Sequence, residues 1–338
     1  MIGLQMKVKA ATTVIYLSLL LFLFGSPLQG EPVPKDLIGS WSLDLETDEP
    51  AWIRIVEQDG KSLVYMRIHV GSDGPYEVTE VSANGQVKFA MDRRRKKNGL
   101  AASPTVFVGL RAEGQLEGMI ERTVKKGEAK TTKFTGKRFP AMPEAPNLSQ
   151  VRFGHPVALF NGKDLTGWRP HESDKINGWS VTDGLLTNTT TKTDFRATGA
   201  YANLRTEAEF EDFWLHIEFM VEAKRNSGVY LRGMYEAQVV DRDSPMQGIQ
   251  GVGAIFGHIE PSINAGKVGG EWQSYDLTLV DRHVTVVLNG VKVIDNRPVW
   301  GPTGGAVNTD PSAPGPIHLQ GDHTAVKYRN IYLAPVMK

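Results

Sequence analysis

Beyond residue 30 the chain alternates apolar and polar positions with a period of two, and long helical periodicity is almost absent. Short alternating stretches broken by Gly, Asn and Asp are typical of antiparallel sheet. The predicted strands of the first part are "WIRIVEQ", "LVYMRIHV", "YEVTEV", "QVKFAMD", "TVFVGLRAEGQLEGMIERTV" and "KTTKFTGKRF". Six to eight strands in roughly 105 residues indicate a small antiparallel barrel or sandwich at 31–139. Its role does not follow from the sequence.

A segment with three prolines, "PAMPEAPNLSQ" at 140–150, has no apolar rhythm and predicts a stiff linker, which we place at 140–152. From 153 to 338 the pattern is again all-β, and roughly 185 residues of this kind fit a two-sheet jelly roll better than a small barrel. The stretches 241–271 and 296–316 are predicted long loops, which in compact sheet domains are usually functional or mobile.

Alternation places polar side chains on one face of several strands of this second part. In "LHIEFMV", His216 and Glu218 lie opposite the apolar set, and in "PIHLQ" His318 and Gln320 do the same. The bland explanation is a half-exposed sheet with a polar outside. Outer faces usually collect Lys, Thr, Ser and Glu, however, whereas these strands carry His, Gln, Tyr and Arg, which suits binding to a sugar.

The hairpin "NSGVYLRGMYEAQVVD" at 226–241 raises the question of register. A two-residue loop would mix its polar and apolar faces. A three-residue loop at 233–235 pairs Arg232 with Glu236 and keeps each face uniform, so we expect that register. The polar face would then carry four side chains, those of Tyr230, Arg232, Glu236 and Gln238.

The first thirty residues have the layout of an export signal, with Lys7 and Lys9 followed by an apolar run at 10–24. That run is short for a spanning helix, which needs roughly 20 residues. We expect cleavage near Gly30, export to the periplasm or the extracellular space, and no membrane attachment afterwards. A retained membrane anchor is the alternative.

Charge and cysteine content narrow the function classes. The chain has 38 basic and 38 acidic residues, and removing two signal lysines leaves 36 against 38, a formal charge of −2. Nothing in this balance suggests a polyanion partner, and "RRRKK" at 93–97 precedes "NG" and is predicted to be a solvated turn, so we do not expect nucleic-acid binding. Without cysteine there is neither a lipoprotein anchor nor a disulfide, and stability must come from core burial.

Two short motifs of the first part, "GSW" at 39–41 and "GKRF" at 136–139, resemble the lipocalin-like pattern in which a Trp packs beneath a late Arg. An ordinary core Trp is the alternative.

Four motifs of the second part occur in a specific order and spacing: "ALFNGKDLTGWRP" (158–170), "NSGVYLRGMYEAQVVD" (226–241), "GEWQSYDLTLVDRHVTVVLNGVKVID" (270–295) and "GPIHLQGDHTAVKYRNIYLAPV" (315–336). Together they resemble the 3-keto-disaccharide hydrolase family, which is frequent in secreted bacterial proteins. The resemblance covers about 155–338 and leaves 31–145 uncovered. It implies a concanavalin-like jelly roll and activity, as lyase and hydratase, on glycosides oxidised to a ketone at sugar carbon 3.

Such chemistry needs a base for the hydrogen on carbon 2, a donor at the enolate oxygen and an acid at the leaving oxygen. Glu236 is the predicted base, His318 the acid or enolate donor with Gln320, and Asp241 a metal ligand or orienting group. The residues predicted to bind substrate are Arg232, Gln238, Gln320, Tyr230, Glu218, His216, His323, His258 and Trp272.

The sequence requires no cofactor, since it has no dinucleotide fingerprint and no phosphate-binding loop, so a separate sugar 3-dehydrogenase must make the ketone. A divalent metal is possible, although no tight ligand spacing is present. Two alternatives remain open: a non-catalytic carbohydrate-binding module of the same fold, and a working first part tethered to glycan by the second.

Overall fold

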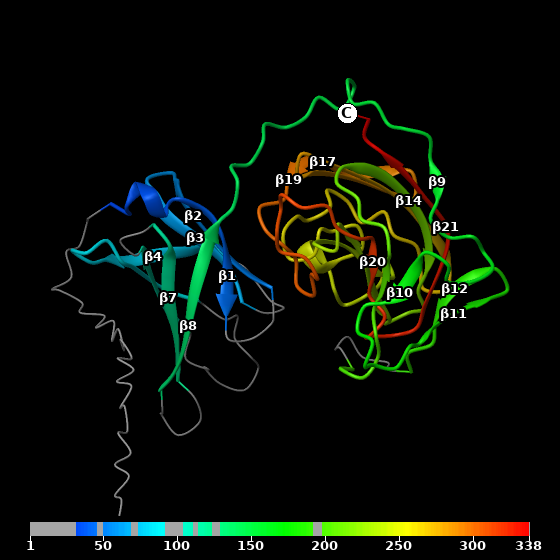
Figure 1. Cartoon of the computed structure of the whole chain (residues 1–338), viewed down its shortest axis with the longest axis horizontal. Helices are drawn as coiled ribbons and strands as arrows, with labels where there is room; N and C mark the ends of the chain where they lie inside the picture. Colours follow the sequence, from blue (N-terminus) through cyan, green and yellow to red (C-terminus); the bar gives the residue numbers. More distant parts are fainter. Residues whose placement is uncertain are drawn as a thin grey trace, which may run out of the picture.

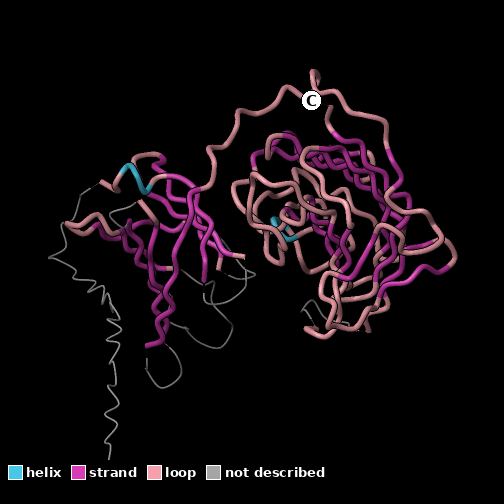
Figure 2. Tube along the Cα trace, viewed as in Figure 1, coloured by secondary structure: helices cyan, strands magenta, loops and turns pink. Residues whose placement is uncertain are grey.

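The computed structural model describes residues 32–45, 50–68, 74–91, 104–110, 114–123, 129–191 and 198–337. Nearly all its regular structure is strand, with two short 3-10 turns at Lys35–Leu37 (η1) and Gly248–Gln250 (η2) (Figure 2). The all-β fold expected from the alternation is confirmed. The predicted signal at 1–30 and the "RRRKK" turn lie outside the described residues.

The first part is a closed eight-stranded antiparallel barrel in which the last strand pairs with the first (Figure 1). Its strands are β1 (Gly39–Leu45), β2 (Ala51–Gln58), β3 (Lys61–Arg67), β4 (Tyr76–Val81), β5 (Val87–Ala90), β6 (Thr105–Leu110), β7 (Leu116–Thr123) and β8 (Ala129–Arg138).

Every second residue of a barrel strand points into the barrel and packs in its core. Ile53 and Ile55 of β2 are examples, and both are fully buried. The Trp41 ring is buried, and the Arg138 guanidinium lies 4.2 Å from the centre of that ring. A late Arg over an early Trp is the arrangement that the lipocalin-like motifs predicted, and it is confirmed.

The second part is a sandwich of two sheets. One sheet has the strand order β10-β13-β20-β15-β16, and the other has the order β11-β12-β21-β14-β17-β18-β19, with β9 beside β21. Its strands are β9 (Val157–Ala158), β10 (Trp168–Pro170), β11 (Trp179–Thr182), β12 (Leu185–Asn188), β13 (Leu204–Thr206), β14 (Phe213–Met220), β15 (Asn226–Leu231), β16 (Tyr235–Val240), β17 (Trp272–Val280), β18 (His283–Leu288), β19 (Val291–Pro298), β20 (His318–Leu319) and β21 (Val326–Pro335).

The core lies between the two sheets. On β14 of the larger sheet every second residue, such as Leu215 and Ile217, is fully buried. Val229, Ala237 and Leu319 of the smaller sheet face it and are also fully buried. This is the two-sheet jelly roll that the pattern predicted.

Two long loops cover the other face of the five-stranded sheet. The loop after β19 is anchored by Thr303, whose N–H donates to Met234 O at 2.9 Å. The loop after β16 is anchored by Phe256, whose N–H donates to Glu236 O at 2.9 Å. This face is therefore shielded from water, although it lies outside the core.

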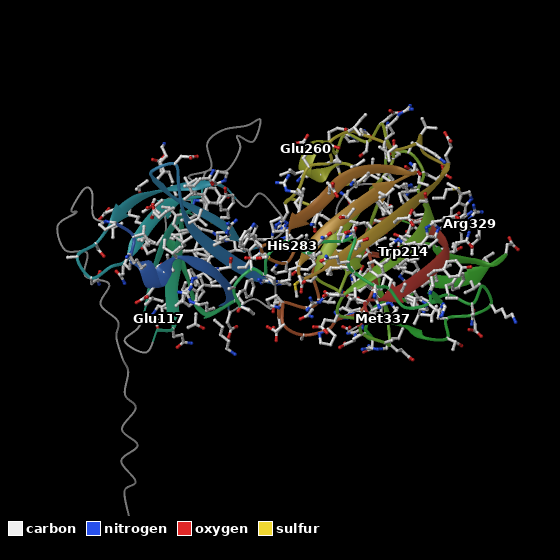
Figure 3. The ribbon with its side chains drawn as sticks, turned by 90° about the horizontal axis from the view of Figure 1, so that it is seen from above. Glu117, Trp214, Glu260, His283, Arg329 and Met337 are labelled. Carbon is white, nitrogen blue, oxygen red and sulfur yellow. The ribbon has the colours of Figure 1, made fainter. Side chains whose placement is uncertain are left out.

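The barrel packs against these loops through the outer side of β2 and β3 (Figure 3). Trp52 and Arg67 are register partners on that side, yet only 2% and 1% of their surfaces are exposed. Trp52 Nε1 donates to Pro302 O at 2.9 Å. An outward-facing Trp that is buried marks a docking surface.

The proline-rich segment between barrel and sandwich is fastened to the larger sheet. Arg282 Nη2 donates to Pro140 O at 3.1 Å, and Asn296 Nδ2 donates to Pro146 O at 2.9 Å.

Among the described residues, neither 3-10 turn nor any other helical segment has the length and apolar character needed to cross a bilayer.

The sandwich core generates a prediction for stability. Ile217→Ala is expected to lower the free energy of unfolding by about 2–5 kcal/mol because it leaves a cavity between the sheets. The matched control is Thr278→Ala on the outer side of β17, expected to change it by less than about 0.5 kcal/mol. Urea denaturation measures both, and equal losses would contradict the assignment of faces.

Candidate active site

The covered face of the five-stranded sheet carries most of the predicted polar residues. Tyr230 of β15 is the register partner of Glu236 on β16 and of His318 on β20. Directly opposed residues point to the same side of a sheet, and Gln238 follows Glu236 by two positions. Gln320 joins the group, because its Nε2 lies 3.3 Å from the Tyr230 hydroxyl. The predicted common face is confirmed for these five residues.

Arg232 does not belong to this group, and its predicted pairing with Glu236 is wrong. The three-residue loop exists, but it comprises residues 232–234, because Leu231 pairs with Tyr235. Arg232 and Gly233 both have positive φ, 56° and 61°, as a type I′ turn requires. A non-glycine residue such as Arg seldom adopts this conformation. The sequence prediction therefore assigned Arg232 to the strand and began the turn one residue too late.

Arg232 has a structural task instead. It is 2% exposed, and its Nη2 donates to Pro311 O at 3.0 Å and to Ala313 O. The guanidinium thus holds the loop that follows β19. Because Arg232 lies in the turn and not in the strand, its guanidinium contacts this loop, and its charge is not among those that shift the pKa of Glu236.

Glu236 is the central titratable group of the face. Burial raises its pKa to about 8, hydrogen bonding to Tyr230 and the charge of Arg67 oppose that shift, and the charge of Asp322 adds to it. The carboxyl lies against Gly228, where an added Cβ would sit 2.2 Å from its Oε1. The carboxyl therefore exchanges its proton near neutral pH, as a general base must.

Tyr230 and His318 supply neutral polar groups beside Glu236. The Tyr230 hydroxyl donates to Gly304 O at 2.8 Å, and burial raises its pKa well above the ordinary value. Burial, aided by the charges of His171 and Arg205, lowers the pKa of His318 to about 3. His318 is therefore neutral at pH 7, which favours donation to an enolate oxygen over the role of cationic acid.

Four buried polar atoms on this side have no hydrogen-bond partner among the described residues: His171 Nδ1, His318 Nδ1, Gln320 Oε1 and Asn226 Oδ1. The rings of His171 and His318 meet edge to face, with centroids 5.6 Å apart. An unpaired buried polar atom costs about 1–3 kcal/mol. Such a cluster is suited to the hydroxyl groups of a sugar.

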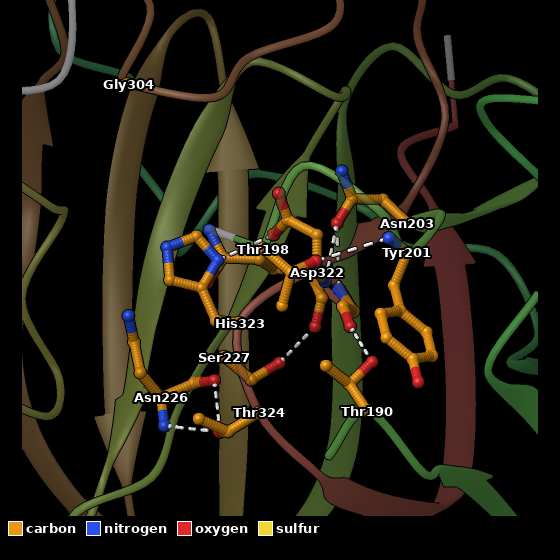
Figure 4. Close-up of polar contacts among 12 residues, drawn as sticks. Thr190, Thr198, Tyr201, Asn203, Asn226, Ser227, Gly304, Asp322, His323 and Thr324 are labelled. Atoms are coloured by element: carbon orange, nitrogen blue, oxygen red, sulfur yellow. Dashed lines mark hydrogen bonds and ion pairs between the residues drawn. The ribbon is translucent and has the colours of Figure 1, made fainter. Parts of the chain in front are cut away.

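The loop after β20 lies at the more open margin of the cluster, and Figure 4 shows its residues Asp322 and His323 together with Asn203. Asp322 Oδ1 lies 2.6 Å from His323 Nδ1, and their side chains are 13% and 16% exposed. Asn203 Oδ1 accepts hydrogen bonds from Gly321 N at 2.8 Å and from Asp322 N at 3.3 Å. His323 thus lies beside the site, as predicted, paired with a carboxylate that the sequence did not single out.

Three predicted substrate-binding residues lie elsewhere, and their placement is a correction: His216, Glu218 and Trp272 occupy the outer side of the larger sheet. His216 Nδ1 lies 2.8 Å from Asp276 Oδ1. Arg329 Nε lies 2.7 Å from Glu218 Oε2, and its guanidinium centre lies 3.9 Å from the Trp272 ring. Alternation assigned their face correctly but could not say which sheet their strands join.

The remaining predicted residues have structural partners. Asp241 accepts hydrogen bonds from Lys224 N at 2.9 Å and Asp243 N at 3.1 Å, which is turn-capping chemistry, and its catalytic role stays a prediction. Gln238 Nε2 donates to Gln250 O at 3.2 Å and so holds the loop around η2.

His258 stacks on the barrel's Trp52, with ring centroids 5.3 Å apart, and burial lowers its pKa to about 3. It therefore lies at the junction of barrel and sandwich.

Four residues of the site were not predicted: His171, Asp322, Asn226 and Arg67. Asn226 and Asp322 lie in motifs that contain predicted residues, and His171 directly follows the motif at 158–170. Arg67 had no such signal, because a barrel strand does not reveal what its outer face contacts. Within the described ranges, no three His, Asp or Glu side chains form a group that could hold a metal ion.

Residues 155–334 match the family described as the 3-keto-alpha-glucoside-1,2-lyase-like domain. Two crystal structures of candidate glycosyl hydrolases from Parabacteroides distasonis are similar to this chain. One is 29% identical over 58% of this chain and 93% of its own, with a TM-score of 0.43. The other is 22% identical over 54% and 94%, with a TM-score of 0.45.

An endo-beta-1,3(4)-glucanase of family GH16 is 11% identical over 59% of this chain and 93% of its own, with a TM-score of 0.31. No curated protein matches the chain. The family match spans more than half of the sequence and contains the whole polar face of the five-stranded sheet, whereas Arg67, on the barrel, lies outside it. This chain belongs to the 3-keto-alpha-glucoside-1,2-lyase-like family and is a carbohydrate-active, glycoside-cleaving enzyme.

Proposed function

We propose that this enzyme cleaves glycosides whose sugar has already been oxidised to a ketone at carbon 3, and that it does so by β-elimination with Glu236 as the base. The observation that carries the proposal is a buried carboxyl with a pKa of about 8 beside neutral hydrogen-bonding groups on one sheet face. Ordinary glycosides have no acidic carbon-bound hydrogen, whereas a 3-keto sugar has one on carbon 2. The family description is consistent with such a substrate.

The reaction begins with Glu236 in its ionised, carboxylate form. The carboxylate removes the hydrogen of carbon 2, and the electron pair of that bond forms an enolate with the oxygen on carbon 3. The enolate collapses, a double bond forms between carbons 1 and 2, and the aglycone leaves carbon 1 and takes up a proton. Addition of water to carbon 1 of the enone then gives the free 3-keto sugar.

The neighbouring groups suit the charges that develop. His318, neutral at pH 7, and Gln320 can direct polar atoms at the enolate oxygen, where fixed hydrogen-bond donors stabilise charge effectively. The Asp322–His323 pair, at the more open margin, is our candidate for proton delivery to the leaving oxygen. A divalent metal stays a prediction.

The proximity of Asp322 also favours a second reaction, because a pair of carboxyl groups is what conventional glycoside hydrolysis uses. The two reactions differ in the substrate that they accept. Elimination requires the 3-ketone, whereas hydrolysis through an oxocarbenium-like transition state does not.

A substrate panel tests the proposal. We expect release of aglycone from 3-keto-glucosides and none from the corresponding unoxidised glucosides, measured with and without chelator. Glu236→Gln should lower kcat by at least about 100-fold, the usual contribution of a general base, and leave binding nearly intact. Glu218→Gln, on the outer side of the other sheet, is the matched control. Cleavage of the unoxidised glucosides would favour conventional hydrolysis, and binding without cleavage would favour a carbohydrate-binding module.

The pH profile gives a separate prediction. Since the base works deprotonated and burial raises the pKa of Glu236 to about 8, kcat/KM should rise with pH and level off above about pH 8. Glu236→Asp, which keeps a carboxyl, should retain a rising limb. A profile already flat between pH 5 and 7, where an unperturbed carboxyl is ionised, would exclude Glu236 as the base.

We also propose that the enzyme is exported and works on glycans or glycosides outside the cytoplasm, supplied as ketones by a separate sugar 3-dehydrogenase. The support is the charged and then apolar layout of residues 1–30. Amino-terminal sequencing of protein from the outer fractions of expressing cells is expected to give a start near Glu31. A start at Met1 in the cytoplasmic fraction would contradict export.

A further inference from the structure

The outer side of β2 and β3 is the part of the barrel that reaches the sandwich. Ile53 and Met66 point into the barrel, so their neighbours Trp52 and Arg67 point out. Both outward side chains are nevertheless buried, with 2% and 1% exposed. Burying a guanidinium costs several kcal/mol unless charges compensate it, so this contact indicates a specific role.

The barrel holds two loops that cover the candidate active site. Trp52 contacts the loop after β19 through Pro302 O, and Arg54 lies 3.4 Å from the centre of the Trp300 ring in the same loop. Trp52 also stacks on His258 of the loop after β16. These loops are bonded to the site itself, through Gly304 to the Tyr230 hydroxyl and through Phe256 to Glu236 O.

Arg67 reaches the loop after β16 at Gly257, next to Phe256, whose N–H donates to Glu236 O at 2.9 Å. It crosses Gly257 so closely that an added Cβ there would sit 2.2 Å from Arg67 Nη2. From this position its charge lowers the pKa of Glu236, of Tyr230 and of His258. Three groups of the sandwich thus experience the field of one cation that the barrel supplies.

The charges around Glu236 make this cation distinctive. Five titratable groups affect the pKa of Glu236 or have their own pKa shifted by it: Tyr230 from β15, Asp322 from the loop after β20, Tyr275 from β17, Tyr328 from β21 and Arg67 from β3. Arg67 is the cation of this set. Arg232, expected from the sequence to flank Glu236, serves the loop after β19 instead.

We propose that Arg67 is the cationic positioning residue of the Glu236 site, and that the barrel docks on the sandwich to deliver it. The inference rests on the proposed function for its catalytic meaning, but the effect of the Arg67 charge on Glu236 does not. Arg67 acts through Glu236: its charge favours the carboxylate, and it holds the side chain under the covering loops. The family-matched segment, 155–334, would then be an incomplete active site without the barrel.

The test is a direct titration of Glu236 in the full-length protein labelled with ¹³C at the glutamate side-chain carboxyl. The spectrum of Glu236→Gln identifies the signal by its loss. Arg67→Met, which keeps most of the side-chain bulk without the charge, should raise the pKa of Glu236 by about 1–3 units, the effect of losing a nearby opposite charge. Arg67→Lys should restore a value close to that of the unsubstituted protein.

Arg54→Ala is the matched control, because Arg54 lies on the same barrel face and contacts the same loop through Trp300. This substitution removes a cation from the interface, but the charge of Arg54 is not among those that lower the pKa of Glu236. An unchanged Glu236 titration in Arg67→Met would overturn the inference, as would an equal shift in Arg54→Ala. Arg67→Gln provides a second neutral variant if Arg67→Met does not unfold cooperatively.

Kinetics give an independent readout. If the proposed function holds, the rising limb of kcat/KM should move to higher pH in Arg67→Met and return in Arg67→Lys. If keto-glucosides are not cleaved and the Glu236 signal still shifts, the proposed function fails and the role of Arg67 stands. If they are cleaved and neither the signal nor the limb moves, the role of Arg67 fails alone.

Discussion

The burial of one carboxyl group, Glu236, is the constraint on which the site depends. A carboxylate taken out of water is expensive, so the group either stays protonated or is surrounded by groups that favour its charge. Here both effects operate: burial raises the pKa, and Tyr230 and Arg67 limit the rise. The result is a carboxyl group with a pKa of about 8, which suits the role of general base that we propose for it.

The sandwich makes this burial possible in an unusual place. Glu236 does not point into the core between the sheets, where Val229 and Ala237 lie, but to the outer side of the smaller sheet. That side is buried because two long loops cover it and the barrel packs on those loops. Loops whose backbone groups bond to the sheet can exclude water without filling the site with apolar side chains.

The sequence predicted much of this because strand alternation is a strong signal. The common face of Tyr230, Glu236 and His318 follows from period-two spacing once the strands are recognised. Arg232 was misplaced because a one-residue difference in the start of a turn removes a side chain from the strand. His216, Glu218 and Trp272 were misplaced for another reason: alternation shows that two faces differ, but not which of two stacked sheets a strand joins.

The role of Arg67 could not be predicted, because a contact between the barrel and the sandwich produces no periodic pattern in the sequence of either part.

One residue at this contact, Gly301 in the loop after β19, does reflect the barrel in its identity. An added Cβ at this position would lie 2.4 Å from the Trp52 indole, and the backbone there does not have positive φ, so the absence of a side chain is set by the neighbouring ring alone. Any side chain at this position would displace the Trp52 indole from the loop after β19. The closeness of barrel and loop is therefore limited by a single glycine.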